Sequence, residues 1–227
     1  MLRDLSGSSR ASAREDGNEW SAVARSLGVA ADRLWLVKQV HGIHAIVVRR
    51  DEPAPTTRPQ ADIIVTDDPS LAIGVRVADC APILLHDPVT HAVGAAHAGW
   101  RGTAAGAAGA VVRAMQQAFG SRPSALVAAI GPCLGACCGE VGPDVVEAFR
   151  AGGAAPASLA AWFTPGTGDR SFLDLERANR DQLEAAGVKP DTIFGSGLCT
   201  KTHLARLHSY RGDRDAAGRM VGAIRAI

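Results

Sequence analysis

The fold is decided by the stretch Ala92-Val93-Gly94-Ala95-Ala96-His97-Ala98-Gly99-Trp100-Arg101-Gly102-Thr103. Its first half, residues 92–97, is small and apolar up to His97, which predicts a buried strand. Residues 103–119 change to Ala, Gly, Val, Met and Gln, and predict a helix that Thr103 caps and Gly120 ends. Because Gly106 and Gly109 weaken such a helix, we expect them to pack closely on a sheet.

Other strands and helices are predicted along the rest of the chain. Runs of β-branched and apolar residues predict strands at 34–40, 44–50, 63–66, 71–77, 82–86, 126–130, around Phe194 and at 220–227. Helices are predicted at 143–150 and 175–186, the second capped by Asp174 and ended by Gly187. The proline-rich residues 52–60 predict an exposed loop. We therefore expect an α/β (mixed α+β) fold in a single domain over residues 1–227, with helices flanking mixed β-sheets and candidate catalytic residues at strand ends.

Composition excludes several classes of protein. The 227 residues are 47% hydrophobic and 21% charged, which suits one large core. A net charge of +1 leaves no electrostatic patch for nucleic acid or an anionic membrane. No apolar run reaches the roughly 20 residues of a membrane span, and residues 1–17 lack the apolar core of a signal peptide. We expect a cytoplasmic protein whose five cysteines, an odd number, are free thiols.

Three residues are the best candidates for chemistry: His41, Cys80 and His97. Two imidazoles and one thiolate are a ligand set that leaves an open position on zinc. They are 39 and 17 positions apart, unlike the close ligand pairs of a structural zinc finger, so that only folding can bring them together. Spacing alone favours the alternative, a buried packing cysteine and two hydrogen-bonded histidines. Asp79 is a candidate for orienting a histidine, and His44 is a reserve ligand.

The turn after His97 is a candidate binding loop. Gly99 and Gly102 permit a tight turn or close approach of the backbone to a ligand. Trp100 can stack on a planar base, Arg101 can bind phosphate or carboxylate, and the helix that begins after Thr103 favours an anion at its N-terminus. The alternative is a structural turn with Trp100 in the core and Arg101 in solvent.

A second glycine-rich loop, residues 131–139, contains Cys133, Cys137 and Cys138. Packing of small residues explains these cysteines better than a metal does, because two are adjacent and no histidine is near. The spacing Pro132-Cys133-x-x-x-Cys137 also excludes the zinc-deaminase signature. Polar donors suited to an anion or a ribose gather at 199–202 and 208–211.

Six motifs in one order, from about Leu34 to the C-terminus, resemble the YfiH-like family, whose members are described as laccase-domain proteins, polyphenol oxidases or purine nucleoside phosphorylases. They are Lys38-Gln39-Val40-His41-Gly42, Ala78-Asp79-Cys80-Ala81-Pro82, His97–Gly102, Ile130-Gly131-Pro132-Cys133, Cys199-Thr200 and Ser209-Tyr210-Arg211, followed by Gly218-Arg219-Met220.

The resemblance implies the fold of the catalytic domain of cytotoxic necrotizing factors, and zinc bound by the residues that match His41, Cys80 and His97. It also implies phosphorolysis of adenosine, inosine, guanosine and methylthioadenosine, together with deamination of adenosine. Phosphorolysis needs cations that position phosphate beneath C1′ of the ribose, for which Lys38, Arg101 and Arg211 are the candidates. Deamination needs an open position on the metal at which water is activated.

Three other functions compete with this interpretation. A copper-dependent phenol oxidase needs many His-x-His pairs, and the seven histidines form none. A cysteine hydrolase acting on a muropeptide precursor would use Cys80 as nucleophile and His97 as base. A third possibility is a module that binds a nucleoside without turnover.

Two departures from the family pattern are expected to affect the substrate site. The segment before Leu34 is short and lacks the Ser-Leu-Asn-Leu-Gly stretch common in relatives. Gly139 stands where relatives usually carry Tyr, which predicts a wider or weaker pocket if that Tyr lines it.

Overall fold

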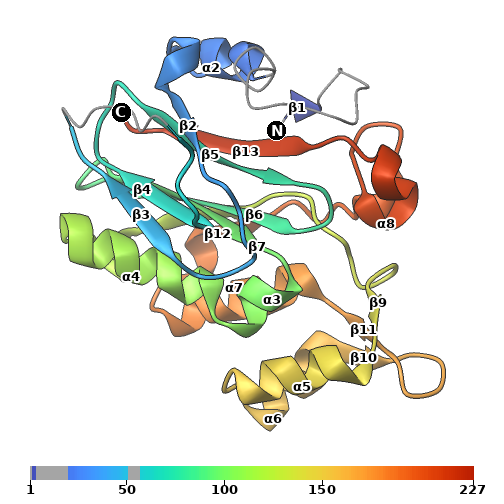
Figure 1. Cartoon of the computed structure of the whole chain (residues 1–227). Coiled ribbons are helices and arrows are strands. Elements are labelled where there is room, and N and C mark those ends of the chain that lie inside the picture. Colours follow the sequence, from blue (N-terminus) through green and yellow to red (C-terminus); the bar gives the residue numbers. More distant parts are fainter. Residues whose placement is uncertain (1, 4–19, 51–56) are drawn as a thin grey trace.

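A central six-stranded mixed sheet organises the computed structural model, which describes residues 2–3, 20–50 and 57–227 (Figure 1). Its strand order is β12-β8-β6-β7-β4-β3, with β3–β4 and β8–β12 parallel and the other pairs antiparallel. The strands are β3 (Ala45–Val48), β4 (Ile63–Thr66), β6 (Ala81–His86), β7 (Val93–Ala98), β8 (Val127–Ile130) and β12 (Ile193–Gly195).

A four-stranded sheet, ordered β1-β13-β5-β2, packs on one face of the central sheet (Figure 1). Its strands are β1 (Leu2–Arg3), β2 (Leu34–Leu36), β5 (Ala72–Val77) and β13 (Met220–Arg225). A small third sheet contains β9 (Glu140–Val141), β10 (Phe163–Pro165) and β11 (Ser171–Leu173). The mixed α/β fold class is therefore confirmed.

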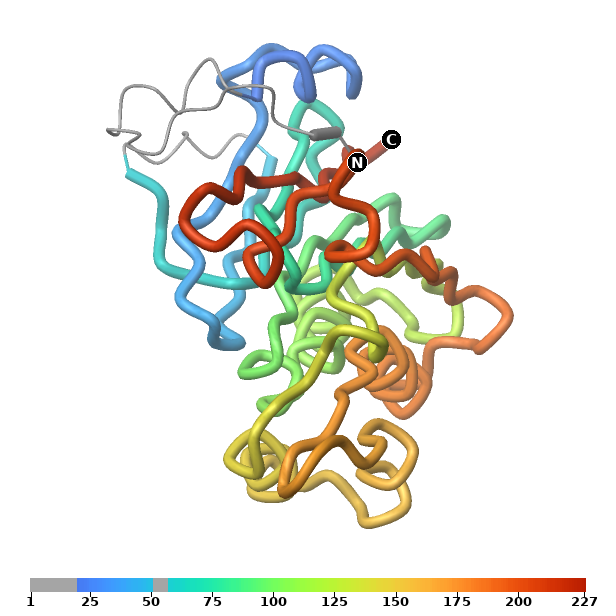
Figure 2. The backbone as a smooth tube through the Cα atoms, turned by 90° about the vertical axis from the view of Figure 1, so that its right-hand side faces the viewer, coloured from blue at the N-terminus to red at the C-terminus, as the bar shows by residue number. Residues whose placement is uncertain are grey.

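Helices cover the other face of the central sheet. Helix α4 (Ala107–Phe119) packs on β7 and β4, and α7 (Leu175–Ala185) lies beside it (Figure 1). Helices α5 (Pro143–Ala151) and α6 (Pro156–Trp162) lie with the small sheet at one end of the molecule, opposite α2 (Ser21–Ser26), as Figure 2 shows. Two further helices, α3 (Trp100–Ala104) and α8 (Tyr210–Asp213), are short.

Successive side chains of the central strands point to opposite faces of the sheet, so the core has two parts, one on each face. Ile63 and Val65 of β4 face the helices, whereas Ile64 between them faces the four-stranded sheet. Both faces are covered, so all four residues of β4 are buried. This explains why the central strands are continuous apolar runs.

The helix predicted at 103–119 is two helices in the structure. Helix α3 starts at Trp100, and Gly106, with φ of 85°, separates it from α4. Thr103 is not an N-cap: it is buried inside α3, where its hydroxyl accepts a hydrogen bond from Asn179 Nδ2 (3.1 Å). Gly120 ends α4 in the left-handed conformation, as predicted.

The predicted close packing of Gly106 and Gly109 on a sheet is wrong. A Cβ on Gly106 would meet nothing within 4 Å, and one on Gly109 would meet only the Arg113 guanidinium. The close approach is instead at Gly94 of β7, where a Cβ would lie 2.9 Å from Val111 Cγ2 and 3.1 Å from Met115 Sδ. The missing side chain therefore belongs to the sheet, which lets α4 pack directly on it.

Most other predicted elements are confirmed, with shifted ends. Strand 63–66 matches β4, and helices 143–150 and 175–186 match α5 and α7, with Asp174 accepting a hydrogen bond from Arg177 N (2.9 Å). The strand predicted at 34–40 ends at Leu36, and its successor β3 belongs to the other sheet. Helices α2 and α6 and the small sheet were not predicted. The predicted loop at 52–60 and the N-terminal segment lie partly outside the described residues.

The structure bears on two expectations drawn from composition, those about membrane spans and about cysteines. No helix in the described ranges is long and apolar enough to cross a membrane. All five cysteines are free thiols.

The packing of α4 on β7 generates a stability prediction. Gly94→Ala should lower the free energy of unfolding by about 1–3 kcal/mol, because the new methyl group overpacks the helix–sheet contact. Gly109→Ala in α4 is the matched control and should stabilise the protein by up to about 1 kcal/mol, because alanine is the better helix former. Urea denaturation measures both, and a Gly94→Ala protein as stable as the control would contradict the close contact.

Candidate functional site

Strand register brings together two of the predicted site residues. Strands β6 and β7 pair Ala81 with Ala98, so Cys80 and Gly99 lie opposite each other just beyond the strand ends. Strands β4 and β7 pair Ile63 with Ala96, which places Asp62 beside His97; His97 N donates to Asp62 O (2.8 Å). The ends of these three adjacent strands therefore lie side by side at one end of the central sheet.

His41 reaches these strand ends through the loop that follows β2. Its φ of 64° is left-handed, which is uncommon for a residue with a side chain. The buried carboxylate of Asp62 accepts hydrogen bonds from the backbone N–H groups of Val40 (3.1 Å), His41 (3.0 Å) and Gly42 (2.7 Å). Asp62 therefore stabilises the unusual backbone that directs His41 toward the other two residues.

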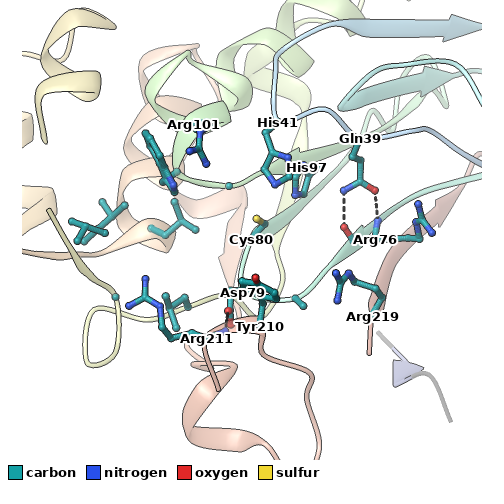
Figure 3. A pocket seen from close by; sticks show the side chains of 18 of the residues that line it. Gln39, His41, Arg76, Asp79, Cys80, His97, Arg101, Tyr210, Arg211 and Arg219 are labelled. Carbon is teal, nitrogen blue, oxygen red and sulfur yellow. Dashed lines mark hydrogen bonds between the residues drawn. The ribbon is translucent and has the colours of Figure 1, made fainter. Parts of the chain in front are cut away.

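The side chains of His41, Cys80 and His97 form one cluster (Figure 3). One ligand atom of each lies within 4.8 Å of the others, and the two imidazole rings are 4.9 Å apart at an interplanar angle of 79°. A Cβ on Gly99 would lie 2.7 Å from Cys80 Sγ and 3.5 Å from His41 Cδ2. Glycine at position 99 therefore leaves the space that the cluster occupies.

Asp62 also sets the orientation of His97. Its Oδ1 lies 2.8 Å from His97 Nδ1, and both side chains are buried. Because Nδ1 bonds Asp62, Nε2 is the ring nitrogen of His97 that is available to the cluster. A carboxylate bonded to the far nitrogen of a histidine is the usual arrangement at metal-binding histidines.

Burial and hydrogen bonding oppose each other in the acid–base properties of the cluster. Burial raises the pKa of Cys80, but hydrogen bonds with His41 and His97 outweigh it and lower that pKa to about 7. Burial lowers the pKa of His97, whereas its bonds with Asp62 and Cys80 raise it to about 9. Without a metal, both pKa shifts act toward a thiolate that faces an imidazolium.

The donor set fits a metal ion. Two imidazoles and one thiolate within 4.8 Å of one another suit zinc with one position open. A metal ion would replace the proton on His97, and its positive charge would balance the negative charge of the thiolate. The space left by Gly99 and the bond from Asp62 to His97 are further features expected of such a site.

The cluster opens into a pocket of about 730 Å³, within the range of small-molecule sites. Figure 3 shows Arg101 and Arg211 at one end of it and Arg76 and Arg219 at the other, with Cys80 between them. Lys38, Gln39, Asp79, Trp100, Tyr210 and Arg214 also line it. An anionic ligand is thus favoured.

All four residues predicted to bind substrate line this pocket: Lys38, Trp100, Arg101 and Arg211. The Arg101 guanidinium lies over the Trp100 ring, 4.2 Å from its centroid, so Arg101 covers one face that was predicted to stack on a base. Arg211 Nη1 donates to the carbonyl oxygens of Cys138 (3.2 Å) and Glu140 (3.0 Å). The predicted anion site at a helix beginning after Thr103 is wrong, because α3 begins at Trp100.

Asp79 does not orient a histidine, contrary to expectation; Asp62 does. The Asp79 carboxylate accepts hydrogen bonds from Thr200 Oγ1 (2.6 Å), Ser209 Oγ (2.6 Å) and Arg211 N (2.5 Å). Asp79 thereby joins the Cys199-Thr200 and Ser209-Tyr210-Arg211 motifs to the strand end next to Cys80.

Several residues of the site were missed from the sequence. Asp62 follows an alanine and precedes an apolar strand, and a charged residue at the start of a fully buried strand was the available signal. Arg76 and Arg214 lie in no motif, and Arg219 lies in the Gly218-Arg219-Met220 motif but was not singled out as a site residue. His44, the reserve ligand, is not part of the three-residue cluster.

Gly139 lines the pocket with backbone. A Cβ there would lie 2.7 Å from Leu173 O and 3.1 Å from Gly135 O, so this backbone admits no side chain at position 139. A tyrosine at this position would need a different loop conformation.

Asp62→Asn tests the orienting role of this carboxylate. The neutral amide keeps the shape but weakens the hold on His97, and we expect about 10- to 100-fold weaker zinc affinity in a chelator-competition titration. Asp87→Asn is the control, since Asp87 is equally buried but bonds Val89 N (2.8 Å) and Thr90 Oγ1 (2.8 Å) at the other end of β6. Equal affinity losses in both variants would contradict a specific role of Asp62.

Comparisons with known proteins agree on one family. A purine nucleoside phosphorylase of Deinococcus radiodurans is 40% identical over 205 residues, covering 89% of this chain and 74% of the relative. The purine nucleoside phosphorylase YlmD of Geobacillus stearothermophilus is 37% identical over 213 residues, covering 91% of this chain and 77% of the relative.

Solved structures give the same result. YfiH of Bacillus licheniformis superposes with a TM-score of 0.89 at 30% identity, covering 99% of this chain and 85% of that chain. Geobacillus stearothermophilus YlmD gives 0.85 at 32% identity, covering 98% and 84%. The family profile described as multi-copper polyphenol oxidoreductase laccase matches residues 7–226, so the chain belongs to this family of YfiH- and YlmD-type proteins.

Proposed function

We propose that this chain is a metal-dependent purine nucleoside phosphorylase that also deaminates adenosine and acts on small molecules in the cytoplasm. The observation that carries the proposal is the His41, Cys80 and His97 cluster in a pocket lined by cationic side chains. The names of the relatives, purine nucleoside phosphorylases, support the same reaction. Adenosine, inosine, guanosine and methylthioadenosine are the expected substrates.

In phosphorolysis, a phosphate oxygen bonds to C1′ of the ribose while the bond from C1′ to the purine nitrogen breaks. The electron pair of that bond leaves with the purine, which takes up a proton. Arg101, Arg211 and Lys38 line the pocket and are the groups that would hold phosphate against C1′. Since Arg211 is fixed by two carbonyl oxygens, its guanidinium is positioned before substrate arrives.

In deamination, water adds at C6 of adenosine and ammonia leaves, which yields inosine. When bound by His41, Cys80 and His97, zinc supplies a Lewis acid with one open position, and copper is the alternative ion. His97 is kept in one orientation by Asp62, so its Nε2 lies on the cluster side in either reaction.

An assay of adenosine with and without phosphate tests the proposal. Adenine released only with phosphate is expected from phosphorolysis, and inosine formed in either case is expected from deamination. Arg101→Gln should raise the KM for phosphate roughly 10- to 100-fold, since a hydrogen bond to a charged group contributes about 1.5–3 kcal/mol. Arg150→Gln, at an exposed position of α5, is the control and should leave KM unchanged. If the zinc-loaded protein forms neither adenine nor inosine, the proposal is refuted.

A second function is favoured by one specific observation. Cys80, His97 and Asp62 have the arrangement of a cysteine hydrolase triad: a thiol of pKa about 7, a histidine beside it, and a carboxylate bonded to the far ring nitrogen. Such an enzyme would hydrolyse an amide, for example in a muropeptide precursor, without a metal.

Metal removal separates the two functions. If the cluster works by binding zinc, a chelator should abolish turnover of nucleosides and added zinc should restore it. The metal-free protein should then be inert toward muropeptides. If the metal-free enzyme instead hydrolyses a muropeptide and loses this activity on alkylation of Cys80, the hydrolase is correct. Cys80→Ala inactivates either enzyme and serves as the blank for both assays.

A further inference from the structure

Three cysteines form a second cluster that shares no residue with the first: Cys137, Cys138 and Cys199. Their Sγ atoms all lie within 4.8 Å of one another, and those of Cys137 and Cys138 are 3.8 Å apart. Cys137 is exposed, Cys138 is half-buried and Cys199 is buried. The loop of residues 131–139 was expected to use its cysteines for packing, which describes the buried Cys133 but not the exposed Cys137.

Backbone pairing between two distant segments builds this cluster. Cys133 and Cys199 form a parallel bridge, with Cys133 N donating to Leu198 O (3.3 Å) and Thr200 N donating to Cys133 O (2.9 Å). The chain then turns back, with Cys138 N donating to Gly135 O (3.0 Å). The turn returns Cys137 and Cys138 to the thiol of Cys199.

Gly135 gives the thiols room to converge. A Cβ at this position would lie 3.1 Å from Cys199 Cβ, and 3.6 Å from the Sγ atoms of both Cys137 and Cys199. A larger residue would therefore occupy the space between the two sides of the cluster. Gly135 serves the second cluster as Gly99 serves the first.

The spacing of the thiols suits a bound metal. Zinc–sulfur bonds of about 2.3 Å in a tetrahedron put neighbouring sulfur atoms about 3.8 Å apart. The Cys137 and Cys138 sulfurs have this separation, and Cys199 needs only a small adjustment to match it. Three thiolates are soft ligands, which select zinc or Cu(I) over magnesium and calcium.

Cationic side chains lie next to the cluster. Cys137 and Cys138 line a depression together with the cationic side chains of Lys201, Arg211 and Arg214. A metal with three thiolates carries net negative charge, which these cations offset. Glu140 and Asp144 also line the depression, and Arg170 pairs with Glu140 (3.6 Å).

We propose that Cys137, Cys138 and Cys199 form a second metal site, for a soft ion bound by three thiolates. Zinc would complete its coordination with water, whereas Cu(I) needs only the three sulfurs. The ion would fasten the 131–139 loop to the segment at Cys199, two parts of the chain that border the candidate active site. It is a structural site that stands whether or not the enzyme is a phosphorylase.

The test uses the full chain carrying Cys80→Ala, which removes the thiolate of the first cluster. The protein, reduced with a phosphine, is titrated in separate arms with Cd(II), Zn(II) and Cu(I), and the sulfur-to-metal absorption of the Cd(II) and Cu(I) arms counts thiolate-bound ions. We expect one ion per chain and a higher Tm on binding. Adding Cys137→Ser or Cys138→Ser should weaken binding at least tenfold, whereas Cys133→Ala, the control, should not.

X-ray absorption identifies the ion and its shell. Three sulfurs with one oxygen for zinc, or three sulfurs alone for Cu(I), would each support the site and name its metal. The site is refuted if the Cys80→Ala protein binds no ion through sulfur, if fewer than three sulfurs surround it, or if the Cys137→Ser protein binds as tightly as its parent. Cys137 is exposed, so its serine variant is expected to fold, and a circular dichroism spectrum checks this.

Discussion

The candidate active site depends on one buried carboxylate. Asp62 is fully buried and accepts hydrogen bonds from three successive backbone N–H groups, Val40 to Gly42, while its Oδ1 also bonds His97 Nδ1. A buried charge is costly unless all its hydrogen-bonding capacity is used, and here it is used fully. These bonds, together with the interaction with His97, keep the pKa of Asp62 below its usual value despite the opposing effect of burial. The same group therefore shapes the backbone at His41 and orients the ring of His97.

The cluster can act in two ways, and what occupies His97 Nε2 decides between them. With a proton there, Cys80 is a thiolate beside an imidazolium, the state in which cysteine enzymes attack carbonyl groups. With a metal there, the same atoms become a ligand set and Cys80 is no longer free to attack. The two candidate functions therefore differ in what would occupy one and the same atom, and metal removal distinguishes them.

The sequence predicts the central strands well and the connections less well. Ile63, Ile64 and Val65 are all apolar because both faces of β4 are covered, so the pattern of this strand is unambiguous. The break at Gly106 was not predictable, since a glycine with positive φ and a glycine in a helix look alike in a sequence. The short α2 and α6 lack the length that makes helical periodicity visible.

The same distinction applies to the site. His41, Cys80 and His97 could be selected because their residue types carry chemistry and their motifs occur in a known order. Asp62 could not, because its importance comes from strand register, which aligns it with His97 thirty-five positions away. Asp79 shows the reverse case: its type and position suggested an interaction with a histidine, but its partners are two hydroxyls and a backbone N–H from the C-terminal part of the chain.

Those partners give Asp79 a consequence for the order of folding. Its hydrogen bonds join residues 121, 130 and 132 positions apart, and β13 lies between β1 and β5 in the four-stranded sheet. Contacts of such long range form slowly, because closing a long loop costs entropy before any contact is gained. During synthesis, the residues that line one side of the pocket emerge after most of the central sheet. The pocket is therefore among the last parts of the molecule to be completed, and a nascent chain that has already formed most of its central sheet still lacks one side of the pocket.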